Sequence, residues 1–157
     1  MKRHIASILF LFLPSVYQSA AQTYSVKRLG IEQGLSNNYV VSITQDKQGF
    51  LWFATEEGLN KFDGTHFITY YKNDPSQNSQ GITGNELNRV YADTKRPMIW
   101  IATQRDGLNA YNYDKQVFTP YLHNPEDPHS LITNDVTDIA LLHKAKTDCG
   151  SVLIIEV

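Results

Sequence analysis

Few side chains in this sequence of 157 residues have the types and spacing that catalysis requires. Its five histidines do not follow a metal-ligand spacing such as His-Glu-x-x-His, and there is no Gly-x-Ser-x-Gly motif or glycine-rich phosphate loop. The one cysteine, Cys149, has no nearby base to activate it and excludes intramolecular disulfides and multi-cysteine metal sites. We therefore predict that the chain is not an enzyme and has no catalytic residue, no metal site and no cofactor.

Two pairs of carboxylates are the nearest approach to an acid–base site. Asp46 and Asp93 form one pair, and Glu57 and Asp106 form the other. Paired carboxylates are the usual apparatus of glycoside hydrolysis. Each pair occupies equivalent positions in two copies of an internal repeat, so that repetition explains its spacing without hydrolysis.

That repeat aligns residues 35–63 with residues 82–112. The first copy reads LSNNYVVSITQD, GFLWFAT and GLNKFD in turn, and the second reads ITGNELNRVYAD, MIWIAT and GLNAYN. Trp52 and Trp100 are 48 positions apart, and a third copy begins at residues 131–139. A repeat of this length indicates that each copy forms one supersecondary unit.

Within one period we predict four short strands, at residues 39–44, 50–55, 58–62 and 66–70. The second is almost wholly apolar, as is typical of a strand buried on both faces, and the Asp-Gly pair before the fourth is a hairpin signal. Four strands per period predict an all-β fold, a partial β-propeller with about two full four-stranded blades plus an incomplete third. A parallel β-helix is the alternative, although its repeats are shorter and lack hairpin turns.

The N-terminus has the three-part pattern of a secretory signal peptide over residues 1–21. A charged start is followed by an apolar run at residues 5–13 and by small residues before Gln22. Because this run is much shorter than the roughly 20 residues of a spanning helix, and no second run follows, we predict an exported chain without a membrane span.

After the signal peptide we divide the chain into four segments. Residues 22–34 are predicted as an N-terminal strand that could close a propeller ring, residues 35–81 as repeat 1, residues 82–130 as repeat 2, and residues 131–157 as an incomplete, divergent repeat 3. In the third copy Cys149 stands where the repeat predicts tryptophan. We therefore favour a truncated or frame-shifted reading frame, although the tail could still pair as a strand.

The repeat resembles a known family. The run GLSNN at residues 34–38, the pattern Asp-x-x-Gly-Phe-Leu-Trp-Phe-Ala-Thr at 46–55 and the run GLNKFDG at 58–64 are similar to the two-component regulator propeller repeat. This resemblance covers roughly residues 24–139. It implies the periplasmic sensor region of a hybrid two-component system of gram-negative gut bacteria, in which propellers precede a membrane span, a histidine kinase, a receiver and a DNA-binding domain. Such proteins are thought to detect breakdown products of complex polysaccharides.

The composition excludes other classes of protein. The formal net charge is −2, which gives no electrostatic footprint for nucleic acid. Hydrophobic residues make up 41% and charged residues 19%, so that the chain is too apolar to be intrinsically disordered.

The repeated tryptophans invite a sugar-stacking role, but their place inside apolar strands favours packing between blades. We therefore assign Trp52 and Trp100, together with the turn glycines Gly58 and Gly107, to the structural core of the repeat. Loops at one propeller face are better placed to present ligand contacts, although turn geometry alone can explain asparagines there. The predicted ligand-binding residues are Asn37, Asn38, Asn85, Glu56, Glu57, Arg105 and Asp106.

These observations predict a periplasmic, ligand-sensing propeller fragment. Its expected partners are an oligosaccharide or another small periplasmic ligand, the remaining blades and the kinase of a parent protein, and no nucleic acid. Self-association is also expected, because an open arc of blades exposes apolar faces and strand edges. A fragment of a propeller-fold carbohydrate-active enzyme and a non-catalytic interaction scaffold are the alternatives. Turnover of oligosaccharides would favour the enzyme, whereas binding without turnover would favour the sensor.

Overall fold

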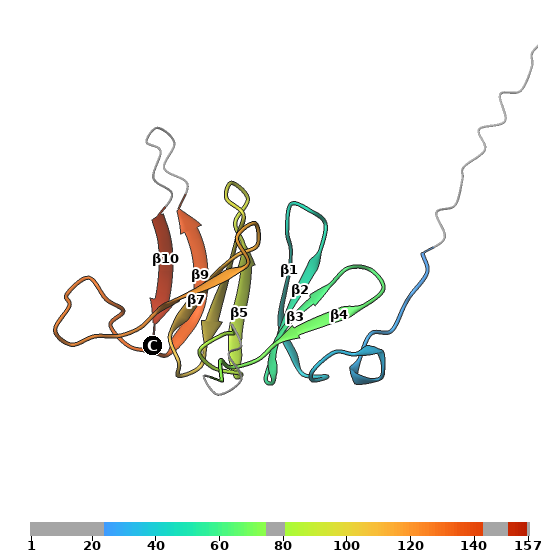
Figure 1. Cartoon of the computed structure of the whole chain (residues 1–157), viewed down its shortest axis with the longest axis horizontal. Helices are drawn as coiled ribbons and strands as arrows, with labels where there is room; N and C mark the ends of the chain where they lie inside the picture. Colours follow the sequence, from blue (N-terminus) through green and yellow to red (C-terminus); the bar gives the residue numbers. More distant parts are fainter. Residues whose placement is uncertain (1–23, 75–80, 143–150, 157) are drawn as a thin grey trace, which may run out of the picture.

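A computed structural model describes residues 24–74, 81–142 and 151–156 (Figure 1). The described residues form three antiparallel sheets and one short 3₁₀ helix, η1 (Ile31–Gln33). None of the described helices is long and apolar enough to cross a membrane. The predicted signal peptide at 1–21 lies outside the described residues.

The first sheet contains, in chain order, β1 (Val40–Gln45), β2 (Leu51–Thr55), β3 (Gly58–Phe62) and β4 (Phe67–Tyr70). Each strand pairs antiparallel with the next, so that the sheet is a simple meander. The strands begin and end within one residue of the sequence prediction.

The second sheet repeats this plan with β5 (Leu87–Ala92), β6 (Met98–Thr103), β7 (Leu108–Asn112) and β8 (Val117–Tyr121). Even an irregularity recurs: the register shifts between Val40 and Ser42 in β1 and between Leu87 and Arg89 in β5. The two sheets are therefore two copies of one four-stranded blade.

The third sheet has two described strands, β9 (Val136–Leu142) and β10 (Ser151–Glu156), which pair antiparallel. The tail of the divergent third repeat thus does pair as a strand. Residues 24–29 form no strand with any described residue, and the 22–34 segment instead contains η1. Its role in closing a ring stays a prediction.

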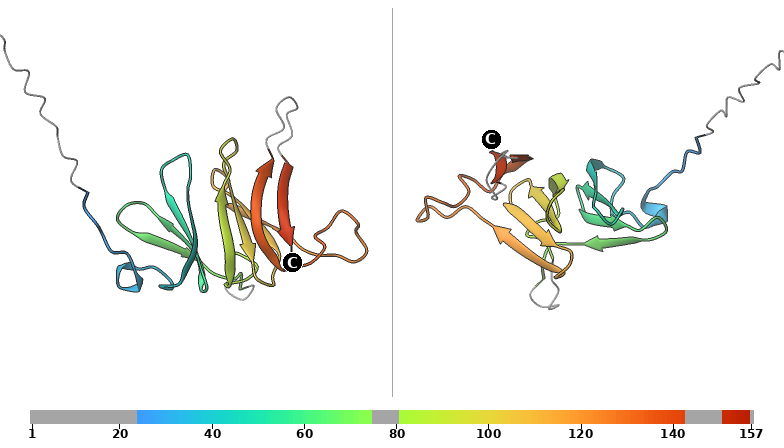
Figure 2. Two further views of the ribbon diagram at one scale, coloured as in Figure 1. Left: turned by 180° about the vertical axis from the view of Figure 1, so that it is seen from behind. Right: turned by 90° about the horizontal axis from the view of Figure 1, so that it is seen from above.

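The three sheets lie side by side along an arc (Figure 2). The first strand of each sheet lies on the inside of the arc, where β1 lies against β5 and β5 against β9. The all-β, partial-propeller fold predicted from the repeat is confirmed.

Alternation along the strands explains how the blades stack. In β6 the side chains of Ile99 and Ile101 join the core between the first and second sheets, whereas Trp100 and Ala102 join the core between the second and third. Trp52 in β2 likewise faces the second sheet, and its neighbour Phe53 faces the opposite side. A strand buried on both faces needs apolar residues at consecutive positions, because successive side chains point to opposite faces.

Candidate functional site

The turn between the second and third strands is built in the same way in both blades. Thr55 Oγ1 donates to the carbonyl of Gly58 at 2.9 Å and accepts a bond from the amide of Glu57 at 3.0 Å. Thr103 Oγ1 donates to the carbonyl of Gly107 at 2.6 Å and accepts from the amide of Asp106 at 2.9 Å. The buried threonine therefore fixes the turn, and the polar residues between threonine and glycine point outward.

Asparagines at equivalent positions hold the blade links against these turns. Asn85 Oδ1 accepts the amide of Lys72 at 2.6 Å, while the Asn85 carbonyl accepts the amide of Gly58 at 2.9 Å. In the next repeat Asn134 accepts the amide of His123 at 2.7 Å through Oδ1 and that of Gly107 at 2.8 Å through its carbonyl. This asparagine ties each link to the turn of the preceding blade.

Asn38 occupies the same position in the first repeat, and its Oδ1 accepts the amide of Ile31 at 3.1 Å. Asn38 is 47 positions before Asn85 in the chain and is predicted, like Asn85, as a ligand contact. The structure places it outside both hollows described below, with its side-chain oxygen committed to the segment that contains η1.

An open hollow of about 720 Å³ lies where the first and second blades meet. We call it the inner hollow, because the inner strands β1 and β5 contribute to its wall. It brings together five of the seven predicted ligand residues: Asn37, Glu56, Glu57, Asn85 and Arg105. Sequence separations of up to 68 residues are closed here by the stacking of the two blades.

The inner hollow also contains residues that sequence reasoning missed. Tyr39, Val41 and Leu87 give it an apolar side, and Glu86, Asn88 and Gln104 add polar groups. The signal that could have identified them is adjacency, since most of them directly neighbour a predicted turn residue or alternate along a predicted inner strand.

Most charged and amide groups at the turns of the inner hollow are uncommitted. The side chains of Glu56, Glu57, Glu86, Gln104 and Arg105 are exposed and have no hydrogen bond or ion pair with any described residue. The tyrosine ring of Tyr39 is 61% exposed beside them. An exposed aromatic ring can pack against the face of a flat ligand, and free donors and acceptors beside the ring can form hydrogen bonds with the edge of that ligand.

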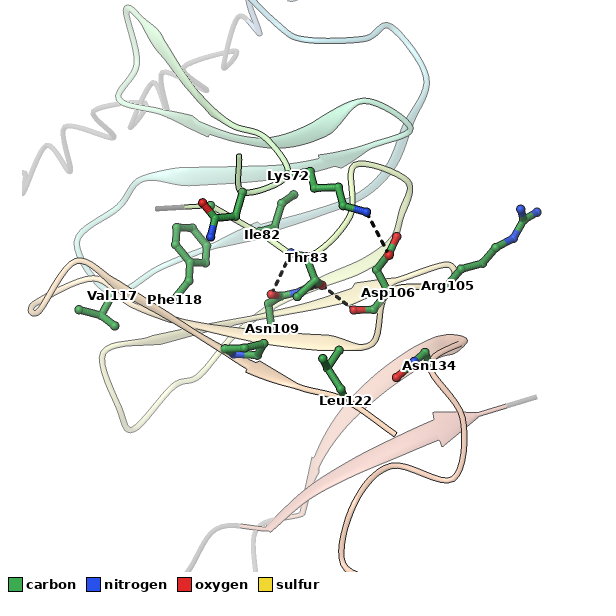
Figure 3. Close-up of a pocket in the computed structure, with 13 residues that line it drawn as sticks. Lys72, Ile82, Thr83, Arg105, Asp106, Asn109, Val117, Phe118, Leu122 and Asn134 are labelled. Carbon is green, nitrogen blue, oxygen red and sulfur yellow. Dashed lines mark hydrogen bonds and ion pairs between the residues drawn. The ribbon is translucent and has the colours of Figure 1, made fainter. Parts of the chain in front are cut away.

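A second hollow of about 520 Å³ lies between the first blade link and the outer strand β8 (Figure 3). In this outer hollow several polar side chains are already paired. Lys72 Nζ lies 3.3 Å from Asp106 Oδ1, and Thr83 Oγ1 donates to the Asp106 carbonyl at 2.5 Å. Asn109 accepts the Thr83 amide at 3.2 Å and donates to its hydroxyl at 2.8 Å. Asp106 therefore lines the outer hollow and not the inner one, and among the described residues Arg105 alone lines both hollows.

The predicted core residues line neither hollow. Trp52 is fully buried and Trp100 is 6% exposed. Gly58 and Gly107 both have positive φ, 105° and 81°. Gly58 is the first residue of β3, and Gly107 directly precedes β7. Among the residues that the structure describes, no group of His, Cys, Asp and Glu side chains is arranged to hold a metal ion.

Comparison with known proteins agrees with this architecture. Residues 34–57 match the model of the family described as two component regulator propeller. The extracellular domain of the hybrid two component system BT3049 from B. thetaiotaomicron is 76% identical, with a TM-score of 0.69, and the match covers 73% of this chain and 16% of that chain.

Two further matches are more distant. The extracellular domain of the hybrid two component system BT4673 from B. thetaiotaomicron is 22% identical, covers 86% of this chain and 19% of that chain, and has a TM-score of 0.57, which is a likeness of fold alone. Histidine kinase P4 of Formosa agariphila is 40% identical over 72 residues, or 46% of this chain and 5% of that protein. The chain therefore spans less than a fifth of the length of each of these relatives.

Proposed function

Because residues 34–57 match the two component regulator propeller model and the chain is similar to the extracellular domain of a hybrid two component system, we propose that it is a periplasmic sensor module. The module binds an oligosaccharide in the inner hollow. It acts as part of a longer sensor whose histidine kinase reads the bound state.

The contrast between the two hollows carries this proposal. In the outer hollow Asp106, Thr83 and Asn109 are bonded to other protein groups, whereas in the inner hollow the side chains of Glu57 and Gln104 have no partner among the described residues. A ligand site needs groups that exchange water for ligand, and groups already bonded within the protein cannot do so without breaking those bonds.

The shape and chemistry of the inner hollow suit a pyranose ring. Such a ring has apolar C–H faces and hydroxyl groups around its edge. Tyr39, directly before β1, and Val41 within β1 supply an apolar surface, and the turn residues of both blades supply donors and acceptors. Because both blades contribute, the ligand's binding energy depends on how the blades are placed, which is the condition for a signal.

The experiment is a binding screen of this chain against a panel of oligosaccharides, followed by variants. We expect Tyr39→Ala to weaken binding by about threefold to tenfold, which corresponds to the 0.5–1.5 kcal/mol of an aromatic contact. Tyr24→Ala is the matched control, because Tyr24 is also an exposed tyrosine, at 82%, but lies outside the hollow.

Two results would contradict the proposal. Equal loss of affinity in both tyrosine variants would remove the inner hollow from consideration. Steady turnover of a bound oligosaccharide would instead favour the carbohydrate-active enzyme.

A further inference from the structure

The charged groups of the inner hollow are unequal in number. Glu56, Glu57 and Glu86 contribute three carboxylates, and Arg105 contributes the one guanidinium among the described lining residues. The chain as a whole has a formal net charge of only −2, so that the excess of negative charge in this hollow is local.

Three described aspartates outside the inner hollow are compensated by a cation. Asp93 and Asp106 pair with Arg96 and Lys72, and Asp138 lies 3.1 Å from the guanidinium of Arg89. The three glutamates of the inner hollow have no such partner among the described residues. Uncompensated charge in a concave site raises the concentration of counter-ions and repels ions of its own sign.

The three glutamates stand at positions that the structure of the two blades fixes. Glu56 and Glu57 form the turn between β2 and β3, which Thr55 fixes, and Glu86 directly precedes β5 beside the anchored Asn85. They therefore come from two blades and face the same hollow as Tyr39.

We propose that the inner hollow selects oligosaccharides by charge: its ligand is a neutral or amine-bearing sugar, and sugars with carboxylate or sulfate groups are excluded. This inference rests on the proposed function and adds the ligand's chemical class. Hydroxyl or ammonium groups of the sugar bond to the free carboxylates, whereas a uronate or sulfate meets three like charges and one opposite charge. An amine-bearing sugar gains a charge-assisted hydrogen bond that a neutral one lacks.

The test compares four classes of oligosaccharide of matched length on this chain: neutral, glucosamine-bearing, uronate-bearing and sulfated. We expect binding of neutral or glucosamine-bearing members, with anionic members at least about tenfold weaker. The double variant E56Q/E57Q should narrow that gap by about tenfold. Raising the salt concentration should narrow it as well, because screening weakens repulsion between exposed charges.

The matched control is E32Q/E126Q, which removes two exposed glutamates that lie outside the hollow. Both double variants change the net charge equally, so that only a local effect distinguishes them. An equal effect of both variants, or anionic sugars that bind this chain as tightly as neutral ones, would overturn the charge inference while leaving the sensor proposal in place. Failure of every class of sugar to bind would instead overturn the proposed function and, with it, this inference.

Discussion

In the blade of β1–β4, Trp52 Nε1 donates a hydrogen bond to Asp46 Oδ2 at 2.8 Å, whereas in the blade of β5–β8 the equivalent Trp100 Nε1 is buried without a partner among the described residues. The strand pairing around the two tryptophans is equivalent. Trp52 pairs with Thr44 and Lys61, and Trp100 pairs with Tyr91 and Ala110. The difference therefore lies in the side chains and not in the sheet.

The turn that precedes the tryptophan strand explains the difference. The first blade has six positions from Asp46 to Trp52, with Gly49 at a φ of 90°, and the second has seven from Asp93 to Trp100. In the longer turn Arg96 Nε donates a hydrogen bond to Asp93 Oδ2, and Arg96 Cζ lies 5.9 Å from the centroid of the Trp100 ring. The carboxylate is thus satisfied by arginine instead of tryptophan.

The interactions that both copies share are the ones that define the blade. Backbone pairing, apolar stacking and the turns at Gly58 and Gly107 recur in both copies, but the polar network around the tryptophan does not. Removal of each feature in turn, in both blades, tests this ranking.

The largest effect is expected from truncation of the tryptophans. Trp52→Ala should lower the free energy of unfolding by about 5 kcal/mol, and Trp100→Ala by about 3 kcal/mol, because only Trp52 also leaves a buried carboxylate without its donor. Urea denaturation followed by circular dichroism measures both. In the matched pair Trp52→Phe and Trp100→Phe, only the first loses a hydrogen bond, so that equal costs would refute the contrast between the blades.

The second largest loss of stability is expected from substitution of the turn glycines. A Cβ on Gly107 would lie 2.5 Å from the Tyr121 carbonyl, and one on Gly58 would lie 2.9 Å from the Tyr70 carbonyl. We expect Gly107→Ala to cost about 3 kcal/mol and Gly58→Ala about 2 kcal/mol, since each adds a clash to the strain of positive φ. Gly64→Ala is the control, because Gly64 has a φ of 100° but no atom within 4 Å of its Cβ. A control that costs as much as the other two would assign the whole effect to φ.

Acid should affect the second blade through Asp93. Burial by itself would raise the pKa of Asp93, but hydrogen bonds from the amides of Lys95 and Arg96 and from the Arg96 guanidinium hold that pKa below its ordinary value of 3.8. The resulting stabilisation is complete at pH values well above 3.8 and is lost as the pH falls through the lowered pKa of the folded state. Asp93→Asn should cost about 1–2 kcal/mol at pH 7. The free energy of unfolding of this variant should also fall less steeply below pH 4 than that of the parent chain. Parallel curves of unfolding free energy against pH would show that Asp93 does not contribute to the pH dependence of stability.

The smallest effect concerns Lys61, which stands where the second blade has Ala110. Its Nζ lies 3.8 Å from the centroid of the Phe50 ring and 5.6 Å from that of Trp52. We expect Lys61→Met, which keeps the apolar stem and removes the charge, to cost about 0.5–1 kcal/mol. If this variant is as stable as the parent chain in the same denaturation assay, the cation–π contact contributes nothing.

The four-stranded blade can be predicted from local sequence patterns alone. Alternating and wholly apolar strands, the Asp-Gly hairpin signal and a repeat of about 48 residues specify four antiparallel strands in each copy, because strand periodicity and turn chemistry are local properties. The strand limits of the first blade follow from these patterns within one residue. The turn residues Glu56, Glu57 and Arg105 were identified as candidates for the same reason.

Where these candidates lie relative to one another depends on the packing of the blades. Glu57 and Arg105 line the same hollow from two blades, Asp106 pairs with Lys72 in a different hollow, and Asn38 Oδ1 accepts a hydrogen bond from the segment before the first blade. The loss of the tryptophan hydrogen bond in the second blade is likewise visible only once Arg96 reaches Asp93. These outcomes depend on which side chains the stacking of blades brings within hydrogen-bonding distance. The repeat pattern assigns the same role to equivalent positions. It therefore cannot distinguish a side chain that bonds to its neighbour from one that remains free for a ligand.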